Sequence, residues 1–295
     1  MNNLVEIMYM QNNNSNNFDS LKLSKYNYIR LSTGEILNYH YNNSRVDNID
    51  NVRRSLKYLR SLINANFKGL DNEKFFTITY KENMTDNKRL KNDCVKFFKR
   101  LRYKYNDFDY ISIVEPQERD AWHAHILLRF NNVNKIWINT NDIERIWKNG
   151  FVKVKAIKGN VNNIGIYLSA YLTDIEYNKQ NIELLKKYDK NINSFEISKV
   201  EIDGINKKFI KGGRLYLYPK NMRIFRKSKG IIEPKIIYDK YCNKEKYVGD
   251  IKPFYTENIK VMNDNDKLGE YLINENKKMI NYICYEQYNK NDYYK

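Results

Sequence analysis

The sequence predicts an α+β fold built on an antiparallel β-sheet with the element order β-α-β-β-α-β. Three observations lead to this prediction. Short segments rich in β-branched and aromatic residues are typical of strands, the segments between them carry apolar residues at helical spacing, and two of the strands are separated only by a short charged turn. All of them lie between residues 74 and 157. This order is typical of a split βαβ unit, in which helices cover one face of the sheet.

A basic amphipathic helix is predicted ahead of this unit, in residues 48–67. Its apolar positions follow helical spacing and are Val52, Leu56, Leu59, Ile63 and Phe67. Cationic residues lie on or near the opposite side, at Arg53, Arg54, Lys57 and Arg60. Either these side chains contact the phosphates of a nucleic acid, or they form the solvated face of a packing helix.

The first strand of the unit is predicted at residues 74–80, and a helix follows with Thr85 as its candidate N-cap. The apolar stripe of this helix consists of Leu90, Cys94, Phe97, Phe98 and Leu101. The next two strands are predicted at residues 109–117 and 122–130, and the turn between them reads ERDA.

A short helix and a fourth strand complete the unit. In the helix, Asn141 and Glu144 are spaced as a capping box, and Gly150 is the expected C-terminal stop. Residues 151–157 then alternate as the fourth strand. A further helix is predicted over NNIGIYLSAYLTD, immediately after this strand.

Outside the unit the signals are weaker. Residues 31–41 alternate enough to predict a strand or a hairpin within an Asn-rich opening segment. A helix is predicted over residues 182–190, a strand closed by Pro219 over residues 212–220, and a basic loop over residues 222–230.

The chain is strongly basic. Its 295 residues contain 52 Lys and Arg against 35 Asp and Glu, which gives a formal net charge of +17. Nucleic acid is the commonest polyanion that such a charge attracts. An AT-rich coding sequence also enriches Lys, so the charge indicates only the class of partner. The 14% of aromatic residues excludes a disordered polybasic tail.

Several other classes of protein are excluded by missing patterns. No stretch approaches the roughly 18 apolar residues of a membrane helix, and the N-terminus has no secretory pattern. The three cysteines, Cys94, Cys242 and Cys284, form no CxxC pair, and no GxxxxGK[ST] phosphate loop occurs. We therefore expect a cytoplasmic protein with no membrane partner and no nucleotide-driven motor of the phosphate-loop type.

Two of the three histidines, His123 and His125, lie two residues apart on a predicted strand. The period of two places both imidazoles on one face of the sheet. Such a pair either binds a metal or consists of half-buried sheet histidines with a structural role. His40 has no partner in the sequence, and we expect it to be structural or exposed.

A hairpin about the ERDA turn brings Glu115 to the same face. In the simplest register Glu115 lies opposite His123, and a shift by two residues places it opposite His125. Two imidazoles and one carboxylate make a three-ligand divalent site with open positions for substrate oxygens and water. Mg²⁺ or Mn²⁺ would suit a phosphate substrate. Without the histidines, Glu115 would be an ordinary exposed strand carboxylate.

Two tyrosines, Tyr167 and Tyr171, are spaced i and i+4 on the helix predicted after the fourth strand. They therefore lie one above the other on one face. The chain contains 26 tyrosines, so several such pairs are expected by chance. The spacing alone does not distinguish a nucleophile from a packing residue.

Taken together, these motifs resemble those of the HUH endonucleases. The strand FFTITY, Glu115 ahead of WHAHILL, and YLSAY on the later helix are similar to motifs one, two and three of that superfamily, in the same order. More narrowly, the sequence resembles rolling-circle replication initiators of plasmids and phages of low-GC Gram-positive bacteria. The stretches NVRRSLKYLRSLINANF, FFTITYKENMTD and GGRLYLYPKNMRIFRKSKGI carry this narrower resemblance, which spans residues 50–232. It implies a ferredoxin- or RRM-like nuclease core.

The resemblance also implies a chemistry. His123 and His125 would bind Mg²⁺ or Mn²⁺ with Glu115 as third ligand, and Tyr167 would attack single-stranded origin DNA. The attack would leave a 5′-phosphotyrosine and a 3′-OH that a polymerase extends. Tyr171 would perform a second strand transfer or only pack. Because the chain has no phosphate loop, a host helicase and a host DNA polymerase would be its partners.

One position departs from the family pattern. The third motif usually reads Tyr-x-x-Lys-Tyr, and Ala170 stands at the lysine position. Lys155 or Lys158 would be substitutes for the missing cation. Three alternatives remain: a relaxase or single-strand transposase of the same superfamily, a decayed origin-binding protein, and an unrelated HxH metalloenzyme acting on small molecules, which the charge disfavours.

We accordingly expect four parts in the chain. They are an N-terminal Asn-rich segment at 1–48, the HUH nuclease domain with its leading basic helix at 49–180, a continuation of the nuclease region at 181–232, and a polar C-terminal extension at 233–295. Arg223 and Arg226, in the basic loop of the third part, join the cations of the leading helix as expected DNA contacts.

Overall fold

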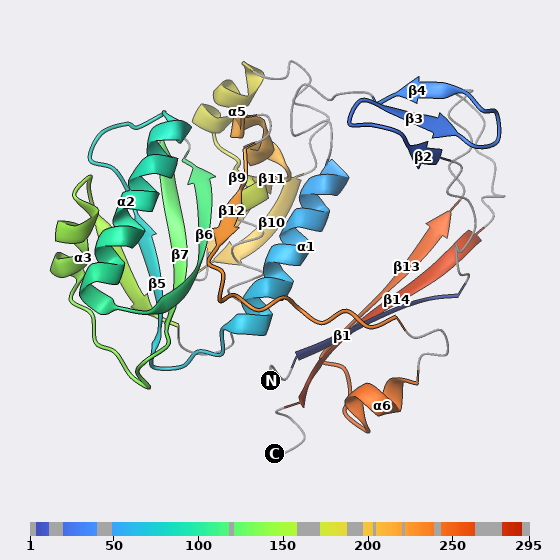
Figure 1. Cartoon of the computed structure of the whole chain (residues 1–295). Helices are drawn as coiled ribbons and strands as arrows, with labels where there is room; N and C mark the ends of the chain where they lie inside the picture. Colours follow the sequence, from blue (N-terminus) through green and yellow to red (C-terminus); the bar gives the residue numbers. More distant parts are fainter. Residues whose placement is uncertain are drawn as a thin grey trace. The chain divides into compact units, whose positions relative to one another are not determined.

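The computed structural model falls into two compact units, one formed by residues 42–234 and one by residues 1–41 together with 235–295 (Figure 1). We describe each unit by itself. The structure describes residues 4–11, 20–39, 49–117, 121–157, 172–187, 197–202, 205–219, 222–238, 243–262 and 279–290.

The larger unit is built on a five-stranded antiparallel sheet with the strand order β12-β6-β7-β5-β8. Its strands are β5 (Glu73–Ile78), β6 (Phe108–Pro116), β7 (Trp122–Phe130), β8 (Val152–Ala156) and β12 (Phe225–Lys227). Helix α2 (Asn87–Tyr105) connects β5 to β6, and α3 (Thr140–Trp147) connects β7 to β8. The predicted α+β class and the β-α-β-β-α-β order are confirmed.

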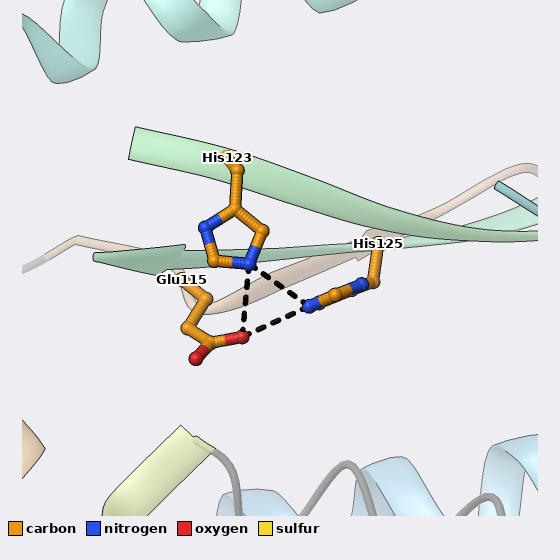
Figure 2. Close-up of side chains that lie close together, drawn as sticks. All are labelled: Glu115, His123 and His125. Atoms are coloured by element: carbon orange, nitrogen blue, oxygen red, sulfur yellow. Dashed lines mark hydrogen bonds and ion pairs between the residues drawn. The ribbon is translucent and has the colours of Figure 1, made fainter. Parts of the chain in front are cut away.

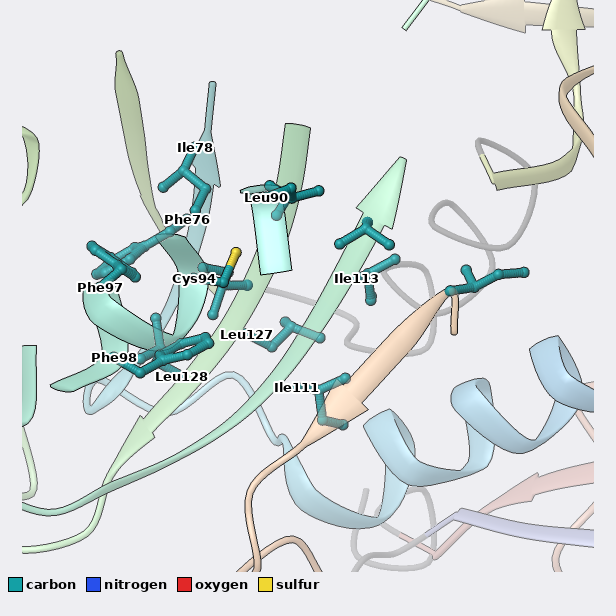
Figure 3. Packing of buried hydrophobic residues seen from close by; sticks show 14 of the residues in the cluster. Phe76, Ile78, Leu90, Cys94, Phe97, Phe98, Ile111, Ile113, Leu127 and Leu128 are labelled. Carbon is teal, nitrogen blue, oxygen red and sulfur yellow. The ribbon is translucent and has the colours of Figure 1, made fainter. Parts of the chain in front are cut away.

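Helix α2 packs on one face of this sheet through the apolar stripe expected from the sequence. All five stripe residues are buried, and they belong to the same apolar core as Phe76 and Ile78 of β5 and Leu128 of β7 (Figure 3). The helix begins one residue later than predicted. Asp86 is the N-cap, because its carboxylate accepts hydrogen bonds from the backbone N–H groups of Lys88 and Arg89.

The ends of α3 also differ from the expected pattern. The N-cap is Asn139, whose side chain accepts from the Asn141 N–H, and Glu144 accepts from the Val152 N–H of the next strand. The helix ends at Lys148, which has the left-handed conformation usually taken by glycine. Gly150 serves another purpose, since a Cβ there would clash with the Thr79 carbonyl oxygen.

Helix α1 (Ile49–Asn66) is the predicted amphipathic helix, and its expected apolar residues are all buried. It packs on the sheet face opposite α2. Arg129, which points to that opposite face because it alternates with Leu128, donates to the backbone oxygen of Asn66 at 2.9 Å. The Asn66 side chain in turn forms two hydrogen bonds of 2.8 Å with the backbone of Ile232.

A second, smaller sheet follows within the same unit. It consists of β9 (Ile175–Glu176), β10 (Ile197–Ile202) and β11 (Ile205–Ile210) in the order β10-β11-β9, with α5 (Lys179–Lys186) beside them. Its own apolar cluster is formed by Ile175, Leu184, Leu185, Ile210 and Leu217. This small core is separate from the core under α2.

Two sequence expectations near the end of this unit were wrong. The strand expected over residues 212–220 is the 3-10 helix η3 (Gly213–Leu217), which begins after Gly212 with φ +69°. Because Arg214 and Leu217 are three residues apart, one 3-10 turn buries both. The basic loop contains strand β12, which pairs with Ile111–Ile113 at the edge of the sheet.

A buried carboxylate fastens this last segment to the sheet. Asp109 of β6 accepts from the Ser228 hydroxyl at 2.8 Å and from Arg129 at 3.1 Å. Gly230 passes so close that a Cβ there would clash with the Asp109 carboxylate. Burial raises the pKa of Asp109, but hydrogen bonds from Ser228, Asn131 and Arg129 outweigh it and lower the pKa below its ordinary value.

Replacing Asp109 by asparagine is expected to lower the free energy of unfolding by about 1–3 kcal/mol at neutral pH, because a buried charged acceptor is lost. A carboxyl with a lowered folded-state pKa stabilises the fold above its unfolded pKa, and this contribution disappears as pH falls through the folded pKa. The difference between variant and wild type should therefore narrow below about pH 4. Urea unfolding at neutral and acid pH measures both values, and an unchanged difference would contradict the assignment.

The other unit joins the two ends of the chain. Strand β1 (Leu4–Met10) pairs with β14 (Met279–Asn289), which also pairs with β13 (Tyr255–Met262), all antiparallel. A separate antiparallel sheet contains β2 (Ser20–Lys22), β3 (Asn27–Arg30) and β4 (Ile36–Asn38). Helix α6 (Lys244–Val248) is tied to β14 by the Lys244–Glu286 ion pair at 2.8 Å.

Within the described residues, no helix is both long enough and apolar enough to span a membrane.

Candidate metal centre

The two-residue spacing of His123 and His125 has the consequence expected from strand geometry. Both side chains leave β7 on the face opposite α2, and Glu115 of β6 joins them there (Figure 2). Glu115 pairs with His123 in the β6–β7 register, and Ile113 pairs with His125. The simpler of the two registers is therefore the correct one.

The three side chains converge on a small triangle of ligand atoms. The distance between the two Nε2 atoms is 3.0 Å, and Glu115 Oε2 lies 2.9 Å from His125 Nε2 and 3.2 Å from His123 Nε2. An octahedral ion with bonds of about 2.1 Å places neighbouring ligand atoms about 3 Å apart. The triangle thus has the dimensions of one face of an octahedron, and this cluster could hold a divalent metal.

The surroundings of His125 favour the tautomer that a metal ligand needs. Thr77 Oγ1 lies 3.2 Å from Nδ1, and a proton on Nδ1 leaves the Nε2 lone pair free. Phe75 stacks on the His125 ring, with the ring planes 11° apart. His123 differs, because its buried Nδ1 has no hydrogen-bond partner among the residues that the structure describes.

Arg214 completes the cluster from η3, far along the chain. Its Nη1 lies 2.6 Å from Glu115 Oε1, so one carboxylate oxygen faces the arginine and the other faces the histidines. Nη1 also donates to the Pro116 backbone oxygen, and Nε donates to the Asp174 backbone oxygen. Arg214 is 7% exposed and Glu115 3% exposed. The guanidinium therefore fixes the direction of the carboxylate.

The electrostatics keep the cluster in the state that binds a cation. Burial raises the pKa of Glu115, but hydrogen bonds from His123 and His125 and the charge of Arg214 outweigh it and hold the pKa well below its usual range. For His123, burial is the largest effect and lowers the pKa. A carboxylate beside a neutral imidazole is the protonation state of a metal ligand set.

Comparison with known proteins places this cluster within a described family. Residues 73–176 match the model of the replication-associated protein ORF2 family. The replication-associated segment, as we call residues 73–176, runs from β5 to β9 and contains the whole Glu115–His123–His125 cluster. No match was found among curated proteins or among solved structures.

The match confirms the predicted resemblance to a replication initiator. It covers less than half of the chain and supports a role in replication initiation, which implies binding of origin DNA. Arg214 lies beyond the replication-associated segment. Sequence reasoning missed this residue, and its only signal was its place in GGRLYLYPK, one of the stretches that carry the resemblance.

The expected nucleophile lies outside the described residues. Tyr167, Tyr171 and Ala170 all fall in the range 158–171, as does Lys158, and His40 falls in the range 40–48. Lys155 is described and exposed on β8, where it pairs with Phe75. Lys153 pairs with Thr77, the residue that contacts His125, so its register position lies closer to the cluster.

The expected DNA contacts are surface residues wherever their side chains are described. Arg54 and Lys57 are exposed on α1, whereas Arg60 is half-buried and Arg53 is described only by its backbone. Arg223 and Arg226 are exposed and lie at the rim of a hollow beside β6.

Proposed function

We propose that this protein nicks and rejoins single-stranded DNA at a replication origin, through a 5′-phosphotyrosine intermediate, for rolling-circle replication of a plasmid or phage. One observation carries this proposal. A carboxylate and two imidazoles form an octahedral-face triangle on the sheet of a replication-associated segment. A metal held there suits the activation of a phosphodiester.

Glu115, His123 and His125 would hold the ion, and a bound divalent ion supplies Lewis-acid stabilisation to a scissile phosphate. We propose Mn²⁺ or Mg²⁺. Two imidazole donors favour Mn²⁺ over Mg²⁺, because Mg²⁺ prefers an all-oxygen set. Arg214 positions the Glu115 carboxylate and is not itself a ligand.

Tyr167 is the proposed nucleophile. Its phenolic oxygen forms a bond to phosphorus as the P–O3′ bond breaks, the phenol loses its proton, and the released 3′ oxygen gains one. The phosphodiester energy is retained in the phosphotyrosine, so the reverse attack by a 3′-OH reseals DNA without ATP. Tyr171 is proposed for a second transfer, and Lys153, Lys155 or Lys158 for the cation that Ala170 does not provide.

The protein would work in the cytoplasm with host factors. We propose a host helicase for unwinding, since the sequence lacks a phosphate loop, and a host DNA polymerase that extends the released 3′-OH. A relaxase or a single-strand transposase would use the same cluster on another element. Ala170 favours one further candidate, an origin-binding protein that no longer cuts.

Replacement of Tyr167 by phenylalanine tests the proposal. Wild-type protein incubated with Mn²⁺ and single-stranded DNA from its own locus should give a covalent protein–DNA band on a denaturing gel. Tyr167→Phe should lose the band because it lacks the attacking oxygen, and Tyr171→Phe, the matched control, should keep it. Loss only in Tyr171→Phe would make Tyr171 the nucleophile. A wild type that binds DNA without forming an adduct would favour the non-cutting protein.

A further inference from the structure

A hollow of about 460 Å³ lies beside β6, on the sheet face that α2 covers. Its walls come from α2, from β6 and from the chain between Pro219 and Arg226. Val114 lines it, and the next residue, Glu115, points to the opposite face of the sheet. The hollow and the metal centre thus flank the same end of β6 from opposite sides.

The rim of this hollow carries positive charge only. Lys88 and Lys91 come from α2, Arg223 and Arg226 come from the other wall, and all four are exposed. The described lining residues include no carboxylate. None of the four cations forms an ion pair with a residue that the structure describes.

Other cations of α2 are neutralised, which sets the rim apart. Arg89 pairs with Glu82 and Asp93, and Lys104 pairs with Asp142 at 2.7 Å. A group of four cations without counter-ions costs free energy through mutual repulsion. A bound polyanion would relieve this repulsion.

The floor of the hollow is uncharged and partly aromatic. Phe98 and Tyr110 stack with ring centroids 3.8 Å apart, and Val95 and Met222 contribute apolar surface beside them. Burial raises the pKa of the Cys94 thiol to about 12, so this group is also neutral. A flat apolar body therefore fits the floor while its charged substituents reach the rim.

We propose that this hollow binds one nucleotide of single-stranded DNA outside the cleavage site, with its base on the floor and its flanking phosphates on the four cations. This inference rests on the proposed function and adds a second DNA contact to it. An unpaired base is required because a paired base cannot reach the floor. Aromatic and apolar floors under cationic rims are how proteins hold single strands without reading sequence.

The charge component is tested by the salt dependence of binding. Fluorescence anisotropy of labelled oligothymidine measures the slope of log K against log salt. Lys88→Gln with Lys91→Gln, and separately Arg223→Gln with Arg226→Gln, should each reduce the slope by about 1.4, or about 0.7 for each lost phosphate contact. Lys96→Gln with Lys99→Gln is the matched control on another side of α2 and should leave the slope unchanged.

The base component needs a second probe. Val95→Ser should weaken binding of oligothymidine several-fold and leave binding of an abasic oligomer of equal length unchanged. Val95 is exposed and lines the hollow, so this change does not disturb the core. Equal loss with both probes would overturn the placement of a base on the floor. Equal competition by polyglutamate would assign the hollow to an acidic chain and overturn the proposal.

The outcomes separate this inference from the proposed function. If both cation pairs match the Lys96/Lys99 control while the wild type forms the Tyr167 adduct, the hollow is not a DNA site and the proposed function stands. If the wild type does not bind oligothymidine, both proposals fail. Thermal unfolding of each variant checks that the fold is retained.

Discussion

Replacing His123 or His125 by alanine is expected to abolish the Mn²⁺-dependent covalent adduct and to leave DNA binding largely intact. Each histidine supplies one corner of the ligand triangle, and its loss leaves two donors. We expect Mn²⁺ binding to weaken by more than the 10–100-fold that loss of an outer hydrogen-bond partner costs. Calorimetric titration with Mn²⁺ measures the affinity directly, and the denaturing gel measures the adduct.

His40→Ala is the control for this experiment, because it removes a histidine from outside the triangle. It should retain both Mn²⁺ binding and the adduct. If His123→Ala and His125→Ala bind Mn²⁺ like the wild type, the metal assignment is wrong. If they lose Mn²⁺ but keep the adduct, the metal has no part in the cleavage.

Replacing Arg214 by glutamine is expected to destabilise the larger unit by about 3–5 kcal/mol, because Glu115 is left buried without its cation. The Pro116 and Asp174 backbone oxygens also lose their donor. Saturating Mn²⁺ should restore part of this stability, since a bound cation compensates the same carboxylate. Urea unfolding with and without Mn²⁺ measures both effects.

A double-mutant cycle separates the positioning role of Arg214 from simple packing. Arg214→Gln with Glu115→Gln should cost less than the sum of the two single changes, because the uncompensated charge is absent. Arg214→Lys should recover part of the stability but not the fixed carboxylate direction, since lysine lacks the planar fork. Additive effects in the cycle would show that the ion pair does not hold Glu115 in place.

The residues of the ligand triangle were predictable because they depend on local geometry. His123 and His125 share a face by the period of the strand, and the short turn leaves Glu115 only a few registers. The stripes of α1 and α2 were equally predictable, since helical spacing determines which residues can face a core. The exact N-cap was not, because Thr85 and Asp86 both qualify and only the backbone path selects Asp86.

The distant members of the site and its surroundings were not predictable in this way. Arg214 meets Glu115 only after η3 folds against the end of β6, and an alternating RLYLY segment predicts a strand. Likewise, Lys88 and Lys91 on α2 face Arg223 and Arg226 only because β12 returns to the edge of the sheet. No spacing in the chain encodes either meeting.

The order of strands and helices, the apolar stripes, and the three ligands on one face follow from the amino-acid pattern alone. Each of these depends on residues close together in the chain, where bond geometry and side-chain period limit the choices. The register of Glu115, the arginine behind it, the cationic hollow, and the pairing of β1 with β14 emerge only in the folded chain. Those features depend on which distant segments bury surface together, and that choice is made by the packing of each folded unit.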